Sequence, residues 1–325
     1  MRAVICHAFG PPEALVVEER PMPEPAPGQV RVKVEAAGVD FADMLMVAGR
    51  YQVKPPTPFI PGSEFCGVID ALGEGVAGWS VGDRVLSAAV DGGFFAEYAC
   101  LPAERVFAWP AGLAAGVAAG FLLGHGTAWF GLIARGGLKS GETVLVTGAG
   151  GGVGIAAIEV AKRAGARVIA AAGAPDKIAL ARRHGADEVI DYRNESLRDR
   201  VKALTEGRGF DILFDTVGGD MFDEALRAGG AYARLLVVGF ASGRIPEVPT
   251  NRLLLKNMSA VGVGFGAMVA TSPGETREVV EALAAMHAKT PFESAAAHEL
   301  SLDQAGEALA RLARREVVGK LIVRP

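Results

Sequence analysis

The sequence predicts an α/β protein of two domains, one with a doubly wound parallel sheet and one that is mostly β. Three observations lead to this prediction. The chain has 325 residues, which is the length of about two domains. Residues 1–105 alternate apolar and polar side chains at period two, as half-buried strands do. From residue 141, short apolar runs alternate with segments of helical spacing, and this indicates βαβ units around a parallel sheet.

The mostly β part contains three clear strand patterns and one short helix before residue 105. The C-terminal tail follows neither the strand-rich pattern of residues 1–105 nor the regular strand–helix alternation of the second part. The predicted strands of these two parts are 29–35, 67–72, 84–88, 293–300 and 320–324, and the predicted helices are 41–48, 274–288 and 302–314.

The second part starts with the apolar run 143–147 and then alternates regularly. The predicted strands are 143–147, 167–171, 188–192, 210–217, 233–239 and 258–265. The predicted helices are 153–164, 177–184, 196–205 and 220–228. Strands that alternate with helices of about ten residues indicate βαβ units and a parallel sheet.

Composition and charge exclude several classes of protein. The formal net charge is −4 and no dense Lys/Arg run occurs, which argues against nucleic-acid binding. Three widely spaced cysteines form neither a disulfide framework nor a metal-binding pair, so we expect reduced thiols and a cytoplasmic protein. The N-terminus has too few apolar residues for a signal peptide.

One segment of the sequence resembles a membrane span. No charged residue lies between Arg105 and Arg135, and glycines recur at every fourth position from 112 to 124. Pro110 and six glycines interrupt the segment, however, and much of the remainder is alanine. We therefore expect buried helices near a domain junction and no membrane span.

The glycine-rich loop after the first strand of the second part is the strongest functional signal. It follows Val144–Thr147 and opens a helix, which is the context in which a GxGxxG pattern binds a dinucleotide. Small residues allow the backbone to approach a pyrophosphate, and the helix N-terminus offers free N–H donors. The predicted cradle, in a domain of the Rossmann type, is Ala149, Gly150, Gly151, Gly152, Val153 and Gly154.

The end of the second strand of this part selects the cofactor. NAD sites place Asp or Glu there, but this strand ends in alanines followed by Gly173. Lys177 follows, and Tyr192 ends the next strand. The absence of an acidic residue at this strand end and the presence of a nearby cation favour binding of a ribose 2′-phosphate. We therefore expect NADPH as the cofactor. Asp176, beside Lys177, argues the other way, and an ordinary exposed helix lysine is the alternative interpretation of Lys177.

The chain resembles the zinc-free quinone oxidoreductases, which are related to zeta-crystallin and belong to the medium-chain dehydrogenase/reductase superfamily. The resemblance covers nearly the whole length and rests on the segments Met1–Val4, Ala37–Asp43, Pro61–Glu64, Val81–Val85, Gly93–Tyr98, Ala149–Gly154 and Gly319–Lys320. It implies a GroES-like, mostly β catalytic domain formed by 1–118 and 267–325, and an NADPH-binding Rossmann domain at 119–266.

The resemblance also implies that no metal is bound. Zinc-dependent relatives carry Cys where this chain has Asp40 and His where it has Ser63, and their lobe of four close cysteines has no counterpart here. Asp40 and Glu64 alone are too few ligands for Zn²⁺. Family members usually have Asn in place of Asp40, so the substrate site can differ here; alternatively, Asp40 only caps the helix at 41–48.

Without a Lewis acid, the acceptor of a hydride must itself be electrophilic, as quinones and α,β-unsaturated carbonyls are. We therefore expect hydride transfer from NADPH to such a substrate. The resemblance implies the catalytic candidates Tyr51, Asp40, Asp43 and Thr127, with Tyr51 as a hydrogen-bond donor to the carbonyl oxygen or, alternatively, only a packing residue. Further cofactor contacts are expected at strand ends and at the C-terminus, namely Val217, Gly218, Val238, Gly239, Phe240, Gly264, Phe265 and Lys320.

The resemblance further implies a homodimer through the edge strand 257–265, since pairing two edges hides them. Two other functions stay open. One is a reductase of an activated alkene such as an enoyl thioester. The other is an NADPH-binding protein with a structural or regulatory role and little turnover.

Overall fold

The computed structural model describes residues 1–293 and 296–325, and its backbone falls into two compact units. Unit 1 comprises Met1–Leu123 and Gly266–Pro325, and unit 2 comprises Gly124–Phe265. The chain therefore leaves unit 1 once and returns to it, and each unit has its own hydrophobic core.

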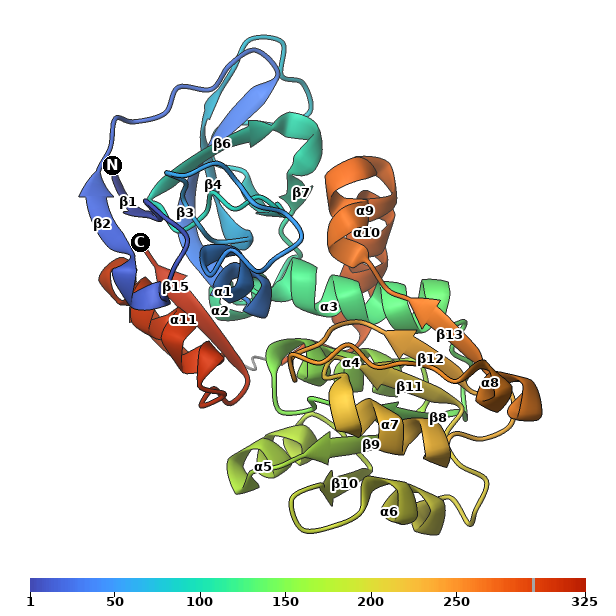
Figure 1. The fold of residues 1–325 in the computed structure, drawn as a ribbon. Coiled ribbons are helices and arrows are strands. Elements are labelled where there is room, and N and C mark those ends of the chain that lie inside the picture. The colour runs from blue at the N-terminus through green and yellow to red at the C-terminus, as the bar shows by residue number, and fades with distance from the viewer. Residues whose placement is uncertain (294–295) are drawn as a thin grey trace. The chain divides into compact units, whose positions relative to one another are not determined.

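Unit 2 contains a parallel sheet in the order β10-β9-β8-β11-β12-β13, whose strands lie side by side in Figure 1. The strands are β8 (Thr143–Val146), β9 (Arg167–Ala172), β10 (Glu188–Asp191), β11 (Ile212–Asp215), β12 (Arg234–Val237) and β13 (Ser259–Gly262). The chain starts in the middle at β8, builds outward through β9 and β10, and then crosses over to β11. This reversal confirms the predicted doubly wound sheet and places the topological switch point between β8 and β11, where such sheets bind ligands.

Helices connect the parallel strands of unit 2 and lie on both sides of its sheet (Figure 1). Helices α4 and α5 contact each other, as do α6 and α7. The helices of this unit are α4 (Gly152–Arg163), α5 (Pro175–Arg183), α6 (Leu197–Leu204), α7 (Gly219–Ala228) and α8 (Thr250–Lys256). Helix α3 (Phe121–Trp129) begins in unit 1 and continues into unit 2, where a π-helical turn at Phe130–Arg135 follows it.

Unit 1 is mostly β, as predicted, and its sheet has the order β14-β15-β3-β4-β5-β7, with β6 also paired to β3. All of these pairs are antiparallel except β14 with β15. The strands of unit 1 are β1 (Arg2–Ile5), β2 (Val16–Glu19), β3 (Gln29–Val39), β4 (Glu64–Leu72), β5 (Arg84–Ala88), β6 (Tyr98–Pro102), β7 (Phe107–Ala108), β14 (Ala296–Ser301) and β15 (Lys320–Arg324). The C-terminal strand β15 therefore pairs with β3 near the start of the chain, so Lys320 comes close to residues 37–39.

The helices of unit 1 include α1 (Phe41–Val47), α2 (Ala115–Ala118), α10 (Pro273–Lys289) and α11 (Ala305–Ala313). Helix α9 (Phe265–Thr271) begins with the last residue of unit 2 and continues in unit 1. The predicted strand 293–300 includes residues 294–295, which lie outside the described residues, while β14 begins at Ala296. The predicted edge strand 257–265 was too long. Asn257 has a left-handed backbone that ends α8, and Phe265 already opens α9, so only Ser259–Gly262 pair with β12.

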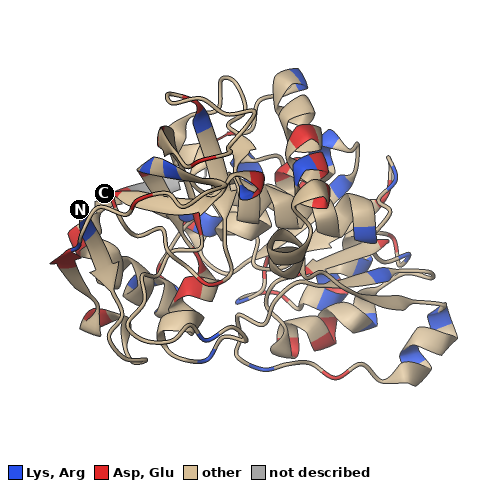
Figure 2. Cartoon of the chain, turned by 90° about the horizontal axis from the view of Figure 1, so that it is seen from above, with Lys and Arg blue, Asp and Glu red and all other residues tan. Residues whose placement is uncertain are grey.

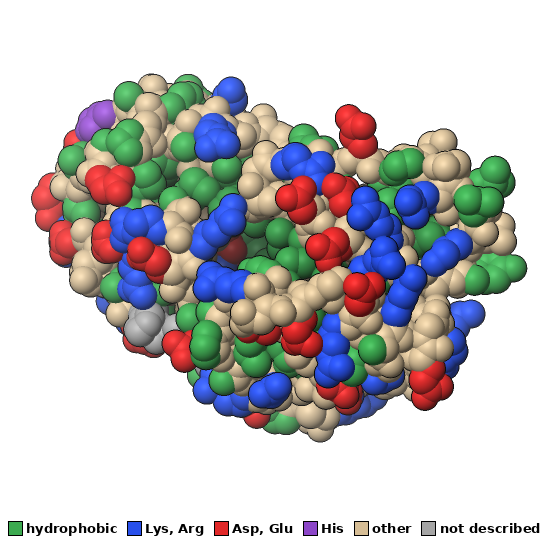
Figure 3. Space-filling view, turned by 60° about the horizontal axis from the view of Figure 1, so that its bottom comes forward, with side chains coloured by type: hydrophobic (Ala, Val, Ile, Leu, Met, Phe, Trp, Pro, Cys, Tyr) green, Lys and Arg blue, Asp and Glu red, His purple; other side chains and the backbone are tan. Residues whose placement is uncertain are grey.

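Lys and Arg are interspersed with Asp and Glu over the cartoon in Figure 2. In Figure 3, hydrophobic side chains reach the surface between charged ones. Within the described residues, no helix is both long and apolar enough to cross a membrane. The uncharged segment between Arg105 and Arg135 instead forms β7, α2, α3 and the π-helical turn, and many of its side chains are buried.

Candidate functional site

The glycine loop of unit 2 connects β8 to α4, as the sequence predicts. Gly148 has φ +63°, a left-handed conformation that glycine adopts without strain. A Cβ atom on Gly154 would lie 2.3 Å from the carbonyl oxygen of Gly148, so only glycine fits at this position. Helix α4 starts after Gly151, which offers no side-chain cap. The first-turn N–H groups of α4 therefore remain available to an anion.

Asp215 fixes the start of this loop, and sequence reasoning had not identified it as a site residue. Its carboxylate is fully buried at the end of β11 and accepts a hydrogen bond from the hydroxyl of Thr147. The same carboxylate accepts the N–H of Gly218 at 2.8 Å and the N–H of Val217 at 3.3 Å. Burial raises the pKa of Asp215, and these hydrogen bonds oppose that shift. The only signal in the sequence was a carboxylate at the end of an apolar strand.

The predicted contacts at the ends of β11 and β12 lie close together. The N–H groups of Val238 and Gly239 both donate to the carbonyl oxygen of Asp215, at 2.9 and 3.2 Å. A Cβ on Gly218 would lie 3.2 Å from the ring of Phe240. Val217, Gly218, Val238, Gly239 and Phe240 therefore form one edge next to the glycine loop, as expected for the carboxyl ends of neighbouring parallel strands.

Lys177 and Tyr192 pack against glycines of the predicted cradle. The aliphatic stem of Lys177, on α5, lies over Gly150, where a Cβ would approach Lys177 Cβ to 2.5 Å. The ring of Tyr192 lies over Gly173 in the same way, with a closest approach of 2.5 Å. Strand β9 ends in Ala172, and Asp176 is exposed on the first turn of α5. The structure thus places a lysine and a tyrosine beside the loop and the β9 end.

Gly264 and Phe265 differ from the other predicted cofactor residues because they follow β13 as a loop and a helix start. The Phe265 side chain is 2% exposed and its ring lies 5.9 Å from that of Phe130. A Cβ on Gly126 of α3 would lie 2.4 Å from the Phe265 ring. The Phe265 side chain is thus part of the core of unit 2, while Gly264 is exposed. Thr127, a predicted catalytic residue, also belongs to unit 2 and is half-buried on α3.

The other three catalytic candidates, Asp40, Asp43 and Tyr51, belong to unit 1. Asp40 stands at the N-cap of α1, and its carboxylate is held by Lys320, whose ammonium lies 2.6 Å from Asp40 Oδ1. The same ammonium lies 2.6 Å from Oε1 of Glu64, the first residue of β4. The negative charge of Asp40 is thus compensated by a cation within unit 1. Lys320, which we expected to reach the cofactor, has its ammonium between these two carboxylates.

Asp43 and Ser63 form a second buried pair next to Asp40. The Ser63 hydroxyl donates to Asp43 Oδ1, and the Asp40 backbone N–H donates to Asp43 Oδ2 at 2.8 Å. Burial raises the pKa of Asp43 to about 7, with a further contribution from the Asp40 charge. Burial likewise raises the pKa of Glu64, and the Lys320 charge opposes that rise. The cluster thus contains a carboxyl group that exchanges its proton near neutral pH.

Tyr51 lies near this cluster, shortly after the end of α1. Its backbone N–H donates to the Leu45 carbonyl at 3.1 Å, which holds the segment against the helix. Burial raises the pKa of the Tyr51 hydroxyl, and the negative charges of Asp43 and Asp40 raise it further. The phenol therefore stays protonated at neutral pH and is able to donate a hydrogen bond. Residues from β15, α1, β4 and the loop after α1 thus converge in unit 1.

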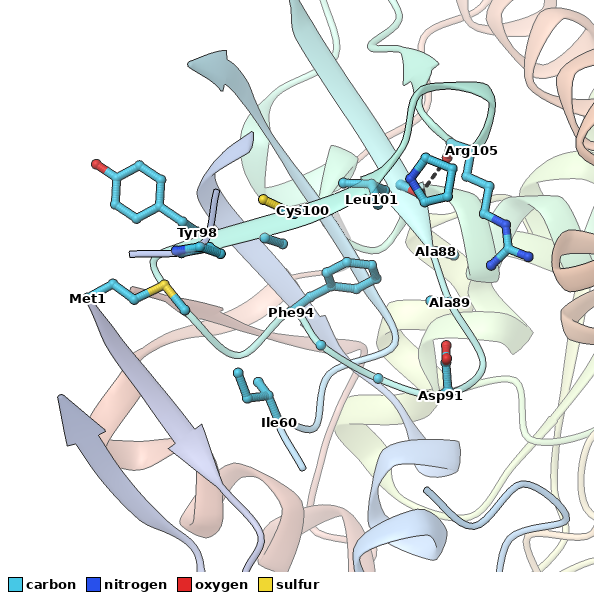
Figure 4. Close-up of a pocket in the computed structure, with 16 residues that line it drawn as sticks. Met1, Ile60, Ala88, Ala89, Asp91, Phe94, Tyr98, Cys100, Leu101 and Arg105 are labelled. Atoms are coloured by element: carbon cyan, nitrogen blue, oxygen red, sulfur yellow. Dashed lines mark hydrogen bonds between the residues drawn. The ribbon is translucent and has the colours of Figure 1, made fainter. Parts of the chain in front are cut away.

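Unit 1 also contains a cavity of about 330 Å³, drawn in Figure 4. Its walls come from β6 and from residues 87–94, and include Phe94, Cys100 and Arg105. The hydroxyl of Ser87 donates to the Arg105 carbonyl at 2.6 Å and joins two of these walls. None of the predicted catalytic residues lines this cavity, so it is not part of the candidate site.

Two family models match the chain, one in each half. Residues 26–111 match the alcohol dehydrogenase GroES-like domain, and residues 152–285 match the zinc-binding dehydrogenase model. The quinone oxidoreductase-like protein 2 homolog of Nematostella vectensis is 39% identical over 99% of this chain and 88% of its own length.

Solved structures agree with these matches over the full chain. A mycobacterial protein complexed with NADPH superposes with a TM-score of 0.91 at 32% identity, and covers 100% of both chains. The Escherichia coli quinone oxidoreductase complexed with NADPH superposes with a TM-score of 0.90 at 27% identity, again covering 100% of both chains. The chain therefore belongs to the quinone oxidoreductase family of the medium-chain dehydrogenase/reductase superfamily, a family of oxidoreductases.

Proposed function

We propose that this protein is an NADPH-dependent oxidoreductase that transfers hydride to a quinone or an α,β-unsaturated carbonyl compound without a metal. The observation that carries the proposal is the glycine cradle of unit 2, with Lys177 against Gly150 and no acidic residue at the end of β9. Two structural neighbours are NADPH complexes, and this supports the same cofactor here.

The residues of unit 2 fit the cofactor. The pyrophosphate would be held by the first-turn N–H groups of α4, where any side chain at Gly154 would collide with the loop. The ribose 2′-phosphate would be held by Lys177, with Tyr192 beside it. The edge formed by Val217, Gly218 and Gly239 would hold the part of the nucleotide beyond the pyrophosphate. Gly173, at the end of β9, would lie beside the cofactor near Lys177 and Tyr192.

The residues of unit 1 do not fit the zinc ion that the name of one matching family model implies. Asp40 and Ser63 stand at the positions that bear zinc ligands in zinc-dependent relatives. Asp40 is ion-paired to Lys320, and the Ser63 hydroxyl donates a hydrogen bond to Asp43. Zn²⁺ prefers thiolate and imidazole ligands, whereas this cluster offers carboxylates and a hydroxyl around an ammonium ion. Among the described residues, no group of three or more His, Cys, Asp or Glu side chains forms a candidate metal site. We therefore derive no metal-dependent step.

Bound NADPH supplies a hydride, and the protein must position the acceptor and provide a proton. In unit 2, Asp215 and Thr147 hold the glycine loop and the Val217–Gly218 turn in a fixed arrangement. In unit 1, the Tyr51 hydroxyl is the donor we assign to the carbonyl oxygen of the acceptor, where negative charge develops. The pKa of Asp43 is raised to about 7. In its ionised form Asp43 lies near enough to Tyr51 for its charge to add to the effect of burial and raise the Tyr51 pKa.

The test is oxidation of NADPH, followed at 340 nm, with a panel of small quinones, enones and one enoyl thioester. We expect turnover with quinones or enones that persists after dialysis against a chelator. Turnover with the enoyl thioester alone would establish the activated-alkene alternative. Thermal stabilisation by NADPH with no oxidation across the panel would instead favour a binding protein with a structural or regulatory role.

We also propose a homodimer formed through β13. This strand is at the edge of the sheet in unit 2, and its residues Ser259, Ala260 and Gly262 are exposed. Next to it in sequence, Leu254 and Leu255 of α8 are each 77% exposed. Pairing of two such edges would bury both features. Light scattering should give twice the chain mass, and Leu254→Glu together with Leu255→Glu should shift it to that of one chain.

The compartment we propose is the cytoplasm, because Cys6, Cys66 and Cys100 are all free thiols. We also propose that unit 1 is the catalytic domain and that unit 2 is the NADPH-binding domain.

A further inference from the structure

Lys320 stands out in unit 1 because its ammonium is buried between two carboxylates. The Lys320 Nζ lies 2.6 Å from Asp40 Oδ1 and 2.6 Å from Glu64 Oε1. The side chains of Lys320 and Asp40 are 11% and 13% exposed, and that of Glu64 is 1% exposed. Both carboxylates raise the pKa of Lys320 and outweigh the effect of its burial, so the amine stays charged.

The surroundings of Lys320 are built to hold this arrangement. Its stem lies against Gly120, where a Cβ would come within 2.8 Å of Lys320 Cε. The second oxygen of Glu64, Oε2, accepts the backbone N–H of Leu123 at 2.9 Å, which fixes the carboxylate from behind. Lys320 begins β15, and that strand is held against β3 by ladder pairing of its next three residues. The position of the ammonium is therefore fixed by contacts of the fold, unlike that of a lysine on a flexible surface side chain.

A divalent metal ion between Asp40 and Glu64 would need the same two carboxylate oxygens that the ammonium occupies. Carboxylates are ligands for Mg²⁺ and Mn²⁺ as well as acceptors for a lysine. An ammonium ion is a compact charge that offers hydrogens to acceptors at short range, so it can hold two carboxylates in place as a metal does. It cannot be lost to a chelator, because it is covalently part of the chain.

We propose that Lys320 is a built-in cation that takes the place of a metal ion between Asp40 and Glu64 and positions both carboxylates. This inference rests on the metal-independent reaction proposed above and explains how unit 1 achieves it. Lys320 is then a positioning residue of the catalytic unit, and not a ligand of the cofactor phosphates. The fold links three distant segments through it, namely the start of β15, the N-cap of α1 and the start of β4.

The proposal predicts that removal of the ammonium creates a site for an added cation. In Lys320→Ala, two buried carboxylates lose their counter-ion, so Tm should fall by about 5–10 °C. Added n-butylammonium or Mn²⁺ should then recover at least half of the loss, whereas n-butanol and NaCl at equal concentration should not. Electron paramagnetic resonance should detect Mn²⁺ bound to Lys320→Ala at about 1 mM metal, an ordinary range for weak carboxylate sites, and none bound to the wild type.

Two further variants separate the role of charge from that of packing. Lys320→Met keeps a long stem against Gly120, so it should be destabilised without recovering in Mn²⁺ or butylammonium. Lys162→Ala removes a half-exposed lysine whose Nζ lies 2.8 Å from Asp187, and it should show a small change in Tm and no cation dependence. If Lys320→Ala is not obtained folded, refolding with n-butylammonium should recover it, and failure to do so would count against the proposal.

The proposal is overturned if folded Lys320→Ala neither binds Mn²⁺ nor recovers stability with either cation. It is equally overturned if the wild type binds Mn²⁺ as tightly as the variant does. These measurements need neither NADPH nor a substrate, so they are independent of the proposed reaction. If the wild type instead oxidises no NADPH with any member of the panel, the proposed function fails while the role of Lys320 can still hold.

Discussion

The glycine loop of unit 2 and the polar cluster of unit 1 are built in opposite ways. The loop is made of backbone: its donors are N–H groups, and all of its key positions lie within the contiguous segment Gly148–Gly154. The cluster is made of side chains, and its main ion pair joins Asp40 to Lys320 across 280 positions. The first depends on the absence of side chains and the second on their exact partners. Substitutions should therefore affect the two regions differently.

The largest effect is expected where a side chain enters the backbone loop. Gly154→Ala places a Cβ 2.3 Å from the Gly148 oxygen, so the loop must shift. We expect the affinity for NADPH to fall about 100-fold, as small misplacements in a binding site can cause. Fluorescence titration with NADPH measures this loss. Gly274→Ala, at a position where a Cβ meets nothing within 4 Å, is the matched control and should bind as the wild type does.

The next effect tests whether the loop depends on one buried side chain. Asp215→Asn keeps the size of the residue but removes the charge that accepts hydrogen bonds from Thr147, Val217 and Gly218. We expect NADPH affinity to fall about 30-fold, or about 2 kcal/mol. An unchanged dissociation constant would show that the loop holds its shape without Asp215.

The third prediction concerns the cluster of unit 1 and its response to pH. The pKa of Asp43 rises from 3.8 to about 7 on folding, so the folded state binds the proton more tightly than the unfolded state. This contribution to stability is full at low pH and is lost as the pH rises toward 7. Relative to Asp43→Asn, the wild type should lose about 1.4 kcal/mol per pH unit, hence about 2 kcal/mol between pH 5 and about 6.5.

Urea unfolding of both proteins across this pH range measures the difference. A difference in unfolding free energy that does not change with pH would mean that Asp43 is already ionised in the folded protein. Above pH about 7 the difference should level off, because Asp43 is then ionised in both states.

The smallest effect is expected at Lys177, where a side chain supplements the backbone cradle. Lys177→Ala should reduce the ratio of kcat/KM for NADPH over NADH about tenfold, the value of one charge-assisted hydrogen bond. Most of the change in this ratio should come from a lower kcat/KM for NADPH, with little change in kcat/KM for NADH. Lys202→Ala, on α6 of the same unit, serves as the control. Equal use of both cofactors by the wild type would contradict the assignment of Lys177 to the 2′-phosphate.

Local patterns predicted the architecture well and the cluster of unit 1 poorly. The doubly wound sheet and the loop–helix junction follow from periodicity and glycine spacing, which are short-range features. The strand 258–265 was predicted too long because its apolar residues continue past Gly262, while the backbone turns into α9 at Phe265. Asp215 was missed, since a single carboxylate at a strand end has many possible roles.

Short-range features of the sequence account for the parallel sheet, the position of the glycine loop and the residue types around it, because each depends on neighbours within a few turns of the chain. Tertiary structure alone decided that Lys320 faces Asp40 and Glu64, and that Ser63 pairs with Asp43. Those contacts require β15 to pair with β3, and β3 with β4, across long loops. The sequence gives the sign of each charged side chain. Its ion-pair partner depends on which distant strands come together and exclude water.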